Sequence, residues 1–155
     1  MQHFVTTLLN SIIAQLLEVA WKELTDDLEK NVHDVEALRA AHERYLEHAM
    51  TRCLLSDRAT PVRNIVTSIY SLILKLRYQI MSSTTSGEGL LSDKAYMDML
   101  RTWRSFRKHT HFLYIVLVKQ VARTGDHYLQ DLLLRLNYNY FYERADTSMA
   151  ELDDI

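Results

Sequence analysis

The sequence predicts an all-α fold, an antiparallel helical bundle of about five main helices with one flexible loop near residues 82–92. Three observations lead to this prediction. Only 3 glycines and 1 proline occur in 155 residues, far fewer turn-forming residues than an all-β fold needs. Apolar residues recur at helical spacing over long stretches. The connections between most of these stretches are short, which makes neighbouring helices antiparallel.

The N-terminal part predicts two helices. A wide apolar face continues over residues 4–28 and predicts one helix of about 28 residues. Residues 31–34 interrupt the pattern, and His33 or Asp34 can cap the helix that follows. We expect that second helix over residues 35–55.

A third helix is predicted from a clear start signal. Thr60 suits the N-cap, and Pro61 suits the first helical position because its missing N–H would be unbonded there in any case. The apolar stripe that follows is so wide that we expect this helix in the middle of the bundle. Residues 82–92 are rich in serine, threonine and glycine, a composition typical of a flexible loop.

Ser92 and Asp93 then cap a fourth helix that extends to about residue 123, with Gly125 as the residue that ends it. Within it, residues 112–118 read FLYIVLV, a run that would also suit a strand, although no partner strand is evident. The side chains expected to face inward are Met99, Leu100, Trp103, Phe106, Leu113, Val116 and Leu117.

A short fifth helix carries a leucine stripe over residues 129–136, and the periodicity ends after it. We expect residues 1–142 to form one helical domain. Residues 143–155 read as an acidic, loosely ordered tail.

Charge and composition restrict the function. Formal net charge is −2, with 6 basic and 10 acidic side chains in residues 1–59 and 12 and 10 in residues 60–155, which predicts no binding of nucleic acid or anionic lipid. The longest apolar run, residues 112–118, is far short of the roughly 20 residues of a membrane span. A single cysteine fits a reducing compartment such as the cytosol. The N-terminus lacks signal-peptide features and enters a helical pattern at once, as expected of a fragment of a longer protein.

Residues 41–50, AHERYLEHAM, raise the question of a metal site. A zinc-binding His-Glu-x-x-His helix needs its second histidine where Leu46 stands, and His48 lies about 120° around the helix from His42. We therefore interpret His42 as a hydrogen-bonded histidine on a packing face. No carboxylate stands three residues before any of the 7 histidines, which argues against a Glu-x-x-His di-metal bundle.

Other catalytic signals are equally weak. Cys53 could act as a nucleophile only beside a histidine, and a small buried hydrophobe is the interpretation we prefer. The sequence holds no glycine-rich phosphate loop or nucleotide fingerprint. We predict no enzyme activity, no cofactor and no bound metal.

Two surfaces could instead meet a partner. Basic residues at 101, 104, 107 and 108 lie mostly along one ridge of the fourth helix, either as an ordinary solvated face or as a strip that meets an acidic protein. The stretch NYNYFYE at residues 137–143 interleaves aromatic and polar side chains, which could anchor a partner or seal the end of the bundle.

Several stretches, taken in order, resemble the closing segment of the gamma-tubulin complex proteins. They cover about residues 1–142 and read MQHFVTTL, LLEVAW, AHERYLEHAMTRCLL, PVRNIVTSIYSLILKLR, THFLYIVLVKQV and LLLRLNYNYFY. In the last of them Tyr138 and Tyr140 stand where the family usually has phenylalanine and a variable residue. Most motif positions, namely Phe4, Trp21, His42, Leu46 and Leu54, fall on apolar stripes and are expected in the core.

The resemblance implies a non-enzymatic helical domain that binds gamma-tubulin in a scaffold for microtubule nucleation, at a centrosome or spindle pole body of the cytoplasmic cytoskeleton. Contacts with other gamma-tubulin complex proteins would lie mainly in an amino-terminal part that is not represented here. The alternative is a generic helical adaptor unrelated to tubulin. The partner-binding residues we expect are Arg101, Arg104, Arg107, Lys108, Asn137 and Asn139.

Overall fold

The computed structural model describes residues 1–85 and 92–142, which are helical almost throughout and contain no strand. The helices are α1 (Gln2–Ile13), α2 (Trp21–Lys30), α3 (Val35–Arg52), α4 (Thr60–Thr85), α5 (Asp93–Thr124) and α6 (His127–Leu136). A π-helical segment, Ala14–Ala20, joins α1 and α2 into one continuous helix. The prediction of an all-α fold with about five main helices is confirmed, and residues 112–118 are helical.

The predicted loop and tail lie largely outside the described residues. Residues 86–91 and 143–155 are not described, so the flexible loop and the loosely ordered tail remain expectations. Residues 82–85, which we assigned to the loop, instead extend α4. Their side chains explain this, because Ser82 and Ser83 both donate to the Gln79 carbonyl and remain compatible with the helix.

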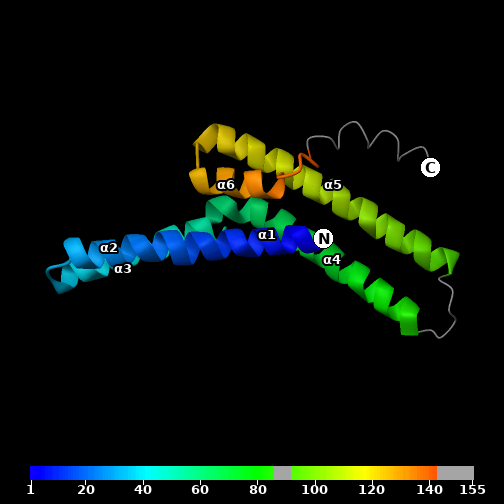
Figure 1. Ribbon diagram of the computed structural model, residues 1–155, viewed down its shortest axis with the longest axis horizontal. Helices are drawn as coiled ribbons and strands as arrows, with labels where there is room; N and C mark the ends of the chain where they lie inside the picture. The colour runs from blue at the N-terminus through cyan, green and yellow to red at the C-terminus, as the bar shows by residue number, and fades with distance from the viewer. Residues whose placement is uncertain (86–91, 143–155) are drawn as a thin grey trace.

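The helices are arranged as antiparallel pairs along an elongated molecule (Figure 1). The α2/α3 hairpin projects at one end of the long axis, and the C-terminal end of α4 and the N-terminal end of α5 lie at the other. Contacts of α1 with α6 and of α4 with α5 form the middle. The continuous N-terminal helix changes partners along its length, because α1 packs on α6 while the π-helical segment and α2 pack on α3.

Helix ends follow local sequence in most places. The Asp34 side chain accepts a hydrogen bond from the Ala37 N–H at 2.7 Å, and Ser92 accepts one from Ala95 at 3.2 Å, so both caps are confirmed. Gly125 ends α5 with φ 67°, the left-handed conformation that favours glycine.

The predicted N-cap at Thr60 is wrong. Thr60 already has helical dihedral angles, φ −50° and ψ −44°, because a short 3₁₀ helix at Asp57–Ala59 leads directly into α4. The extended residue that precedes both helices is Ser56. A helix does begin at this point of the sequence, but the 3₁₀ turn places the start of helical structure at Asp57, three residues before Thr60.

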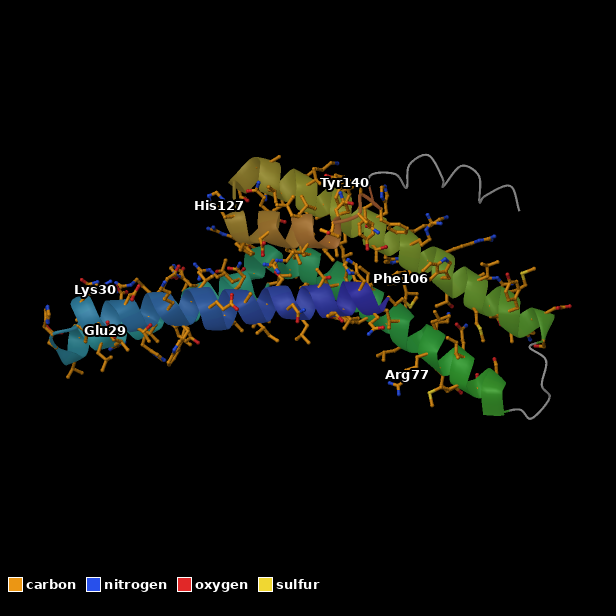
Figure 2. All side chains as sticks on the ribbon, viewed as in Figure 1. Glu29, Lys30, Arg77, Phe106, His127 and Tyr140 are labelled. Carbon is orange, nitrogen blue, oxygen red and sulfur yellow. The ribbon has the colours of Figure 1, made fainter. Side chains whose placement is uncertain are left out.

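The hydrophobic core lies where α1, α4, α5 and α6 meet. Its buried members are Phe4, Leu8, Leu54, Ala59, Val62, Val66, Ile69, Phe106, Leu113, Leu117, Leu129, Leu132, Leu136 and Tyr142. Phe4 meets the rings of Tyr70 and Phe106 edge to face, with centroids 6.3 and 6.4 Å away. Figure 2 shows Phe106 in this central region.

Some helical faces differ from prediction. Only the first half of α4 is central, since Leu74 in its second half is 62% exposed. Trp103 is 40% exposed rather than facing inward, while Thr102 and Thr110 are buried and donate to backbone carbonyls of their own helix. The inward face of α5 is therefore rotated toward its threonines, whose hydroxyls need no external partner.

The expected core positions divide into two groups. Phe4 and Leu54 are buried, as expected, whereas Trp21, His42 and Leu46 are exposed. All three exposed positions belong to the α2/α3 hairpin, where α3 contacts α2 along a narrow line centred on buried Ala41. His42 lies beside that line, so its predicted place on a packing face is wrong.

The helix formed by residues 2–30 is long and apolar enough to cross a membrane by length and composition. An 18-residue window has a mean hydropathy of 1.4, and 24% of that window is buried. This differs from our estimate because that estimate considered only uninterrupted apolar runs. The helix places Phe4 and Leu8 in the core and Leu24 in the α2/α3 hairpin.

Candidate partner interface

A row of basic side chains runs along the outer face of α5. Arg101, Arg104 and Lys108 follow one another at spacings of three and four, which puts them on one face of the helix, and exposed Met97 begins the same row. We call Arg101, Arg104 and Lys108 the basic ridge. The predicted ridge therefore lies on the outer face of α5. Its role in binding a partner is a proposal.

The three ridge residues differ in their contacts. Arg101 donates to the Asp98 carboxylate at 2.8 Å, in an exposed pair one helical turn apart. Such pairs contribute a few tenths of a kcal/mol at most. The Nε of Arg104 is buried and has no hydrogen-bond acceptor among the described residues. Lys108 is exposed. The ridge therefore presents more positive charge than its own helix neutralises.

Arg107 does not belong to this ridge. Its guanidinium carbon lies 5.7 Å from the centroid of the Phe141 ring, a cation–π contact with the turn that follows α6. It therefore ties the C-terminal turn to α5. Of the four basic residues predicted to act together, the structure brings three into one row and places the fourth beside it.

The turn after α6 is built around Asn137. This residue is 9% exposed, and its side-chain oxygen accepts a hydrogen bond from the Tyr142 N–H at 3.1 Å. Tyr142 in turn is buried and stacks on Tyr114 of α5, with ring centroids 5.9 Å apart. Burial raises the pKa of the Tyr142 hydroxyl, which a hydrogen bond with Thr110 partly offsets.

Asn139 lies at the surface of the same turn and accepts a hydrogen bond from the Phe141 N–H at 3.3 Å. Tyr138, which is 83% exposed, and Tyr140 also face outward from it. The tyrosines of this stretch therefore differ in environment. Tyr142 is buried at the end of the bundle, and Tyr138 and Tyr140 are exposed to solvent. Of the two predicted asparagines, Asn137 holds the turn and Asn139 is accessible.

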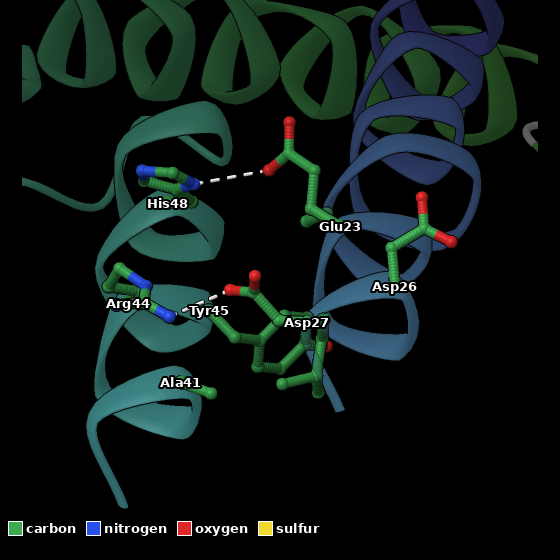
Figure 3. A pocket seen from close by; sticks show the side chains of 9 residues that line it. Glu23, Asp26, Asp27, Ala41, Arg44, Tyr45 and His48 are labelled. Atoms are coloured by element: carbon green, nitrogen blue, oxygen red, sulfur yellow. Dashed lines mark hydrogen bonds and ion pairs between the residues drawn. The ribbon is translucent and has the colours of Figure 1, made fainter. Parts of the chain in front are cut away.

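A second cluster of charged side chains joins α2 to α3 (Figure 3). Glu23 accepts a hydrogen bond from Arg52 at 2.8 Å, and its other oxygen lies 3.1 Å from His48 Nδ1. One turn further along α2, Asp27 accepts bonds from Arg44 and Asn31, each at 2.8 Å. Glu23, Asp27, Arg44 and His48 are among the residues that line a pocket of about 340 Å³. Because Glu23 and Asp27 are already paired, we assign the cluster to holding the hairpin closed.

This cluster should make the hairpin sensitive to acid. The hydrogen bond from Arg52 lowers the pKa of Glu23 below its ordinary 4.5, and the bond from Asn31, followed by that from Arg44, lowers the pKa of Asp27 below 3.8. A carboxylate whose pKa is lower in the folded than in the unfolded state stabilises the fold at pH values above its unfolded-state pKa. This contribution is lost as the pH falls through its folded-state pKa.

We therefore expect Glu23→Gln to reduce the acid sensitivity of the fold. Between pH 5 and pH 3 the melting temperature followed by circular dichroism should fall by about 2 °C less in this variant than in the parent chain. Glu29→Gln, an exposed change on the same helix, is the control and should keep the parent profile. Identical profiles for all three proteins would show that Glu23 does not contribute.

The histidine, cysteine and acidic side chains considered for catalysis or metal binding are dispersed in the described part of the chain. Among the residues that the structure describes, no three histidine, cysteine, aspartate or glutamate side chains gather where they could hold a metal ion. Cys53 is half-buried, and burial raises the pKa of its thiol above 9.0. The thiol is therefore protonated at neutral pH, which is unfavourable for a nucleophile.

Sequence reasoning missed the charged cluster. Its signal is present, since acids at 23 and 27 and bases at 44, 48 and 52 repeat every four residues on two helices joined by a short turn. Two helices joined in this way must lie antiparallel, so these rows face each other. The same argument explains why His48, rather than His42, contacts α2.

The chain is built from paired helices and presents a basic ridge and exposed aromatic side chains on its surface. These features are typical of a helical domain that binds other proteins. Residues 1–142 match the protein family described as Gamma tubulin complex component C-terminal, and the chain belongs to this family. The family consists of non-enzymatic structural proteins.

The relatives agree with the family assignment. The chain is 37% identical to Gamma-tubulin complex component 6 of Homo sapiens over 94% of its own length and 8% of the relative. Over 92% of its length it is 38% identical to component 6 of Mus musculus, again 8% of that protein. Component 5 of Mus musculus is 28% identical over 88% of this chain and 12% of the relative. The sixth and the fifth components, to which the quoted motifs are most similar in pattern, are both among the relatives found, together with component 3 of Arabidopsis thaliana, which is 34% identical over 50% of this chain and 9% of that relative.

Proposed function

We propose that this chain binds gamma-tubulin within a gamma-tubulin complex and thereby supports microtubule nucleation. The observation that supports this most is the family match, which extends over residues 1–142, the region we propose as one domain. The chain spans only 8% of the length of the component 6 proteins, so activities of those whole proteins are carried over as proposals.

The proposed mechanism is positional. A protein that holds gamma-tubulin at a fixed place in a larger assembly supplies part of a preformed nucleus, because linked sites replace encounters from solution with a high effective concentration. Contacts with other gamma-tubulin complex proteins are assigned mainly to parts of such proteins that this chain does not represent. Membership in this family implies association with the cytoskeleton and its microtubule-organising centres. We propose the cytoplasm, and the centrosome or spindle pole body, as the location, with no role for nucleic acid or membrane.

Within the chain, the surface proposed for gamma-tubulin is the basic ridge together with the accessible part of the C-terminal turn. The ridge offers uncompensated positive charge, which steers an acidic partner and fixes its orientation. Exposed Tyr138, Tyr140 and Asn139 lie on the turn that Arg107 ties to the same helix. Arg107 and Asn137 support this surface by positioning the turn.

Charge reversal tests the proposal. We expect the triple variant Arg101→Glu, Arg104→Glu, Arg107→Glu to weaken capture of purified gamma-tubulin by about tenfold or more, because each reversed charge turns attraction into repulsion. A second variant that replaces Lys108 instead of Arg107 restricts the change to the ridge and should lose as much affinity.

The matched control reverses Lys22, Lys30 and Arg39, three exposed cations of the α2/α3 hairpin. It changes net charge equally but at the other end of the molecule, and should bind gamma-tubulin like the parent chain. Circular dichroism verifies that every variant remains helical. Equal capture by the parent and both ridge variants would remove the ridge from the interface, and failure of the parent chain to bind would favour an adaptor unrelated to tubulin.

A further inference from the structure

The basic ridge carries more positive charge than its own helix neutralises. Arg101, Arg104 and Lys108 are neighbours at spacings of three and four, where like charges on a helix repel each other. Among the described residues only Arg101 of these three forms an ion pair, with Asp98. The ridge is therefore suited to an anionic segment laid along it.

The described chain ends against the same helix. Tyr142, its last residue, stacks on Tyr114 of α5, and the preceding Phe141 lies under Arg107. Arg107 is adjacent in sequence to Lys108 of the ridge. The residues that follow Tyr142 therefore begin beside the ridge, at a point fixed by ring stacking and by the Asn137 hydrogen bond to the Tyr142 N–H.

Residues 143–155 have the composition that the ridge requires. ERADTSMAELDDI contains five carboxylate side chains and one basic residue, Arg144. From Tyr114 the ridge extends about 9 Å to Lys108 and about 20 Å to Arg101, at 1.5 Å per helical residue. Thirteen residues can span about 40 Å when extended, so every ridge cation is within reach.

We infer that residues 143–155 bind the basic ridge of α5 within the same molecule. Tethering gives the segment a millimolar effective concentration at the ridge, which compensates for the weakness of individual exposed ion pairs. On the proposed function, the segment also regulates binding. It competes with gamma-tubulin for the ridge, and gamma-tubulin must displace it in order to bind.

Zero-length cross-linking tests this contact in the full chain. A water-soluble carbodiimide joins a lysine amine to a carboxylate only where the two are in contact, and mass spectrometry locates the product. Lys108 is the reporter. Lys119 is an internal control, because both are exposed on α5, lie eleven residues apart on the same side, and stand six and five residues from Tyr114. Mixing isotopically labelled and unlabelled chains identifies products formed between molecules.

Cross-links within one chain to residues 143–155 should form at Lys108 at least about fivefold more than at Lys119, a ratio that corresponds to a few exposed ion pairs. The variant Arg101→Glu, Arg104→Glu keeps Lys108 but should bring the ratio close to one, as should 0.5 M salt through screening. Equal yields at the two lysines in the parent chain would overturn the inference.

A binding measurement separates this inference from the proposed function. Amide substitution of all five acids in residues 143–155 should raise affinity for gamma-tubulin by about threefold or more, since the competitor loses its charge. The matched control changes five glutamates of the π-helical segment, α2 and α3 to glutamine, at positions 18, 29, 36, 43 and 47, and should not raise affinity. Unchanged affinity of the first variant would refute competition. The cross-linking ratio does not depend on gamma-tubulin, so loss of the proposed function would leave it intact.

Discussion

Leu117→Ala is expected to lower the free energy of unfolding by about 3–4 kcal/mol. Leu117 has 0% exposure and belongs to the core cluster formed by α1, α4, α5 and α6. Removing its three terminal carbon atoms leaves a cavity that four packed helices cannot fill without moving together. The substitution should also loosen α5, which carries the basic ridge.

Urea unfolding followed by circular dichroism measures this effect. The matched control is Leu134→Ala on α6, where the same atoms are removed from a side chain that is 66% exposed. That change should alter the free energy of unfolding by no more than about 0.5 kcal/mol. Similar losses for the two variants would contradict the assignment of Leu117 to the core.

Phe4→Ala is expected to cost about 3–5 kcal/mol of unfolding free energy. Phe4 is 2% exposed and places its ring edge to face against Tyr70 of α4 and Phe106 of α5, so one side chain links three helices. Its loss removes both aromatic contacts in addition to the buried area, and aromatic pairs contribute about 0.5–1.5 kcal/mol beyond burial.

Phe112→Ala provides the comparison for this variant, because Phe112 is 53% exposed on α5. We expect it to be at least about 2 kcal/mol less destabilising than Phe4→Ala in the same urea experiment. The Phe4→Ala variant also tests whether α1 belongs to the core. If its removal has no effect, α1 is not part of the core that α4 and α5 form.

The sequence predicted the helix ends that depend on neighbouring residues. The caps at Asp34 and Ser92 and the helix end at Gly125 depend on residues within three or four positions, so the sequence indicates them directly. Thr60 shows the limit of this approach, because a 3₁₀ turn and an α-helix can follow each other without an extended residue between them.

Contacts between distant residues were harder to predict. His42 was expected on the packing face of α3, yet the line that meets α2 contains small Ala41 together with Arg44 and His48. Charged side chains can line a helix contact when each finds an opposite charge across it, and hydrophobic periodicity does not register that. The partners of Glu23 lie 25 and 29 residues away.

The candidate interface shows the same division. Spacing alone grouped the basic residues at 101, 104, 107 and 108 and placed most of them on one ridge of α5. It did not show that Arg107 is the one beside the ridge, and Asn137 was added as a polar residue near the end of the domain. Their contacts with Phe141 and Tyr142 depend on how the chain turns after α6, which no local pattern specifies.

The N-terminal helix belongs to two structural units at once. Residues up to Ile13 pack in the central core, while Trp21–Lys30 pack against α3 in the hairpin, with a π-helical segment between the two parts. Exposed, ion-paired contacts of that kind open at lower free energy than a buried core. The hairpin end of this helix can therefore open while its first residues stay packed in the core, so two regions that share one continuous helix need not unfold together.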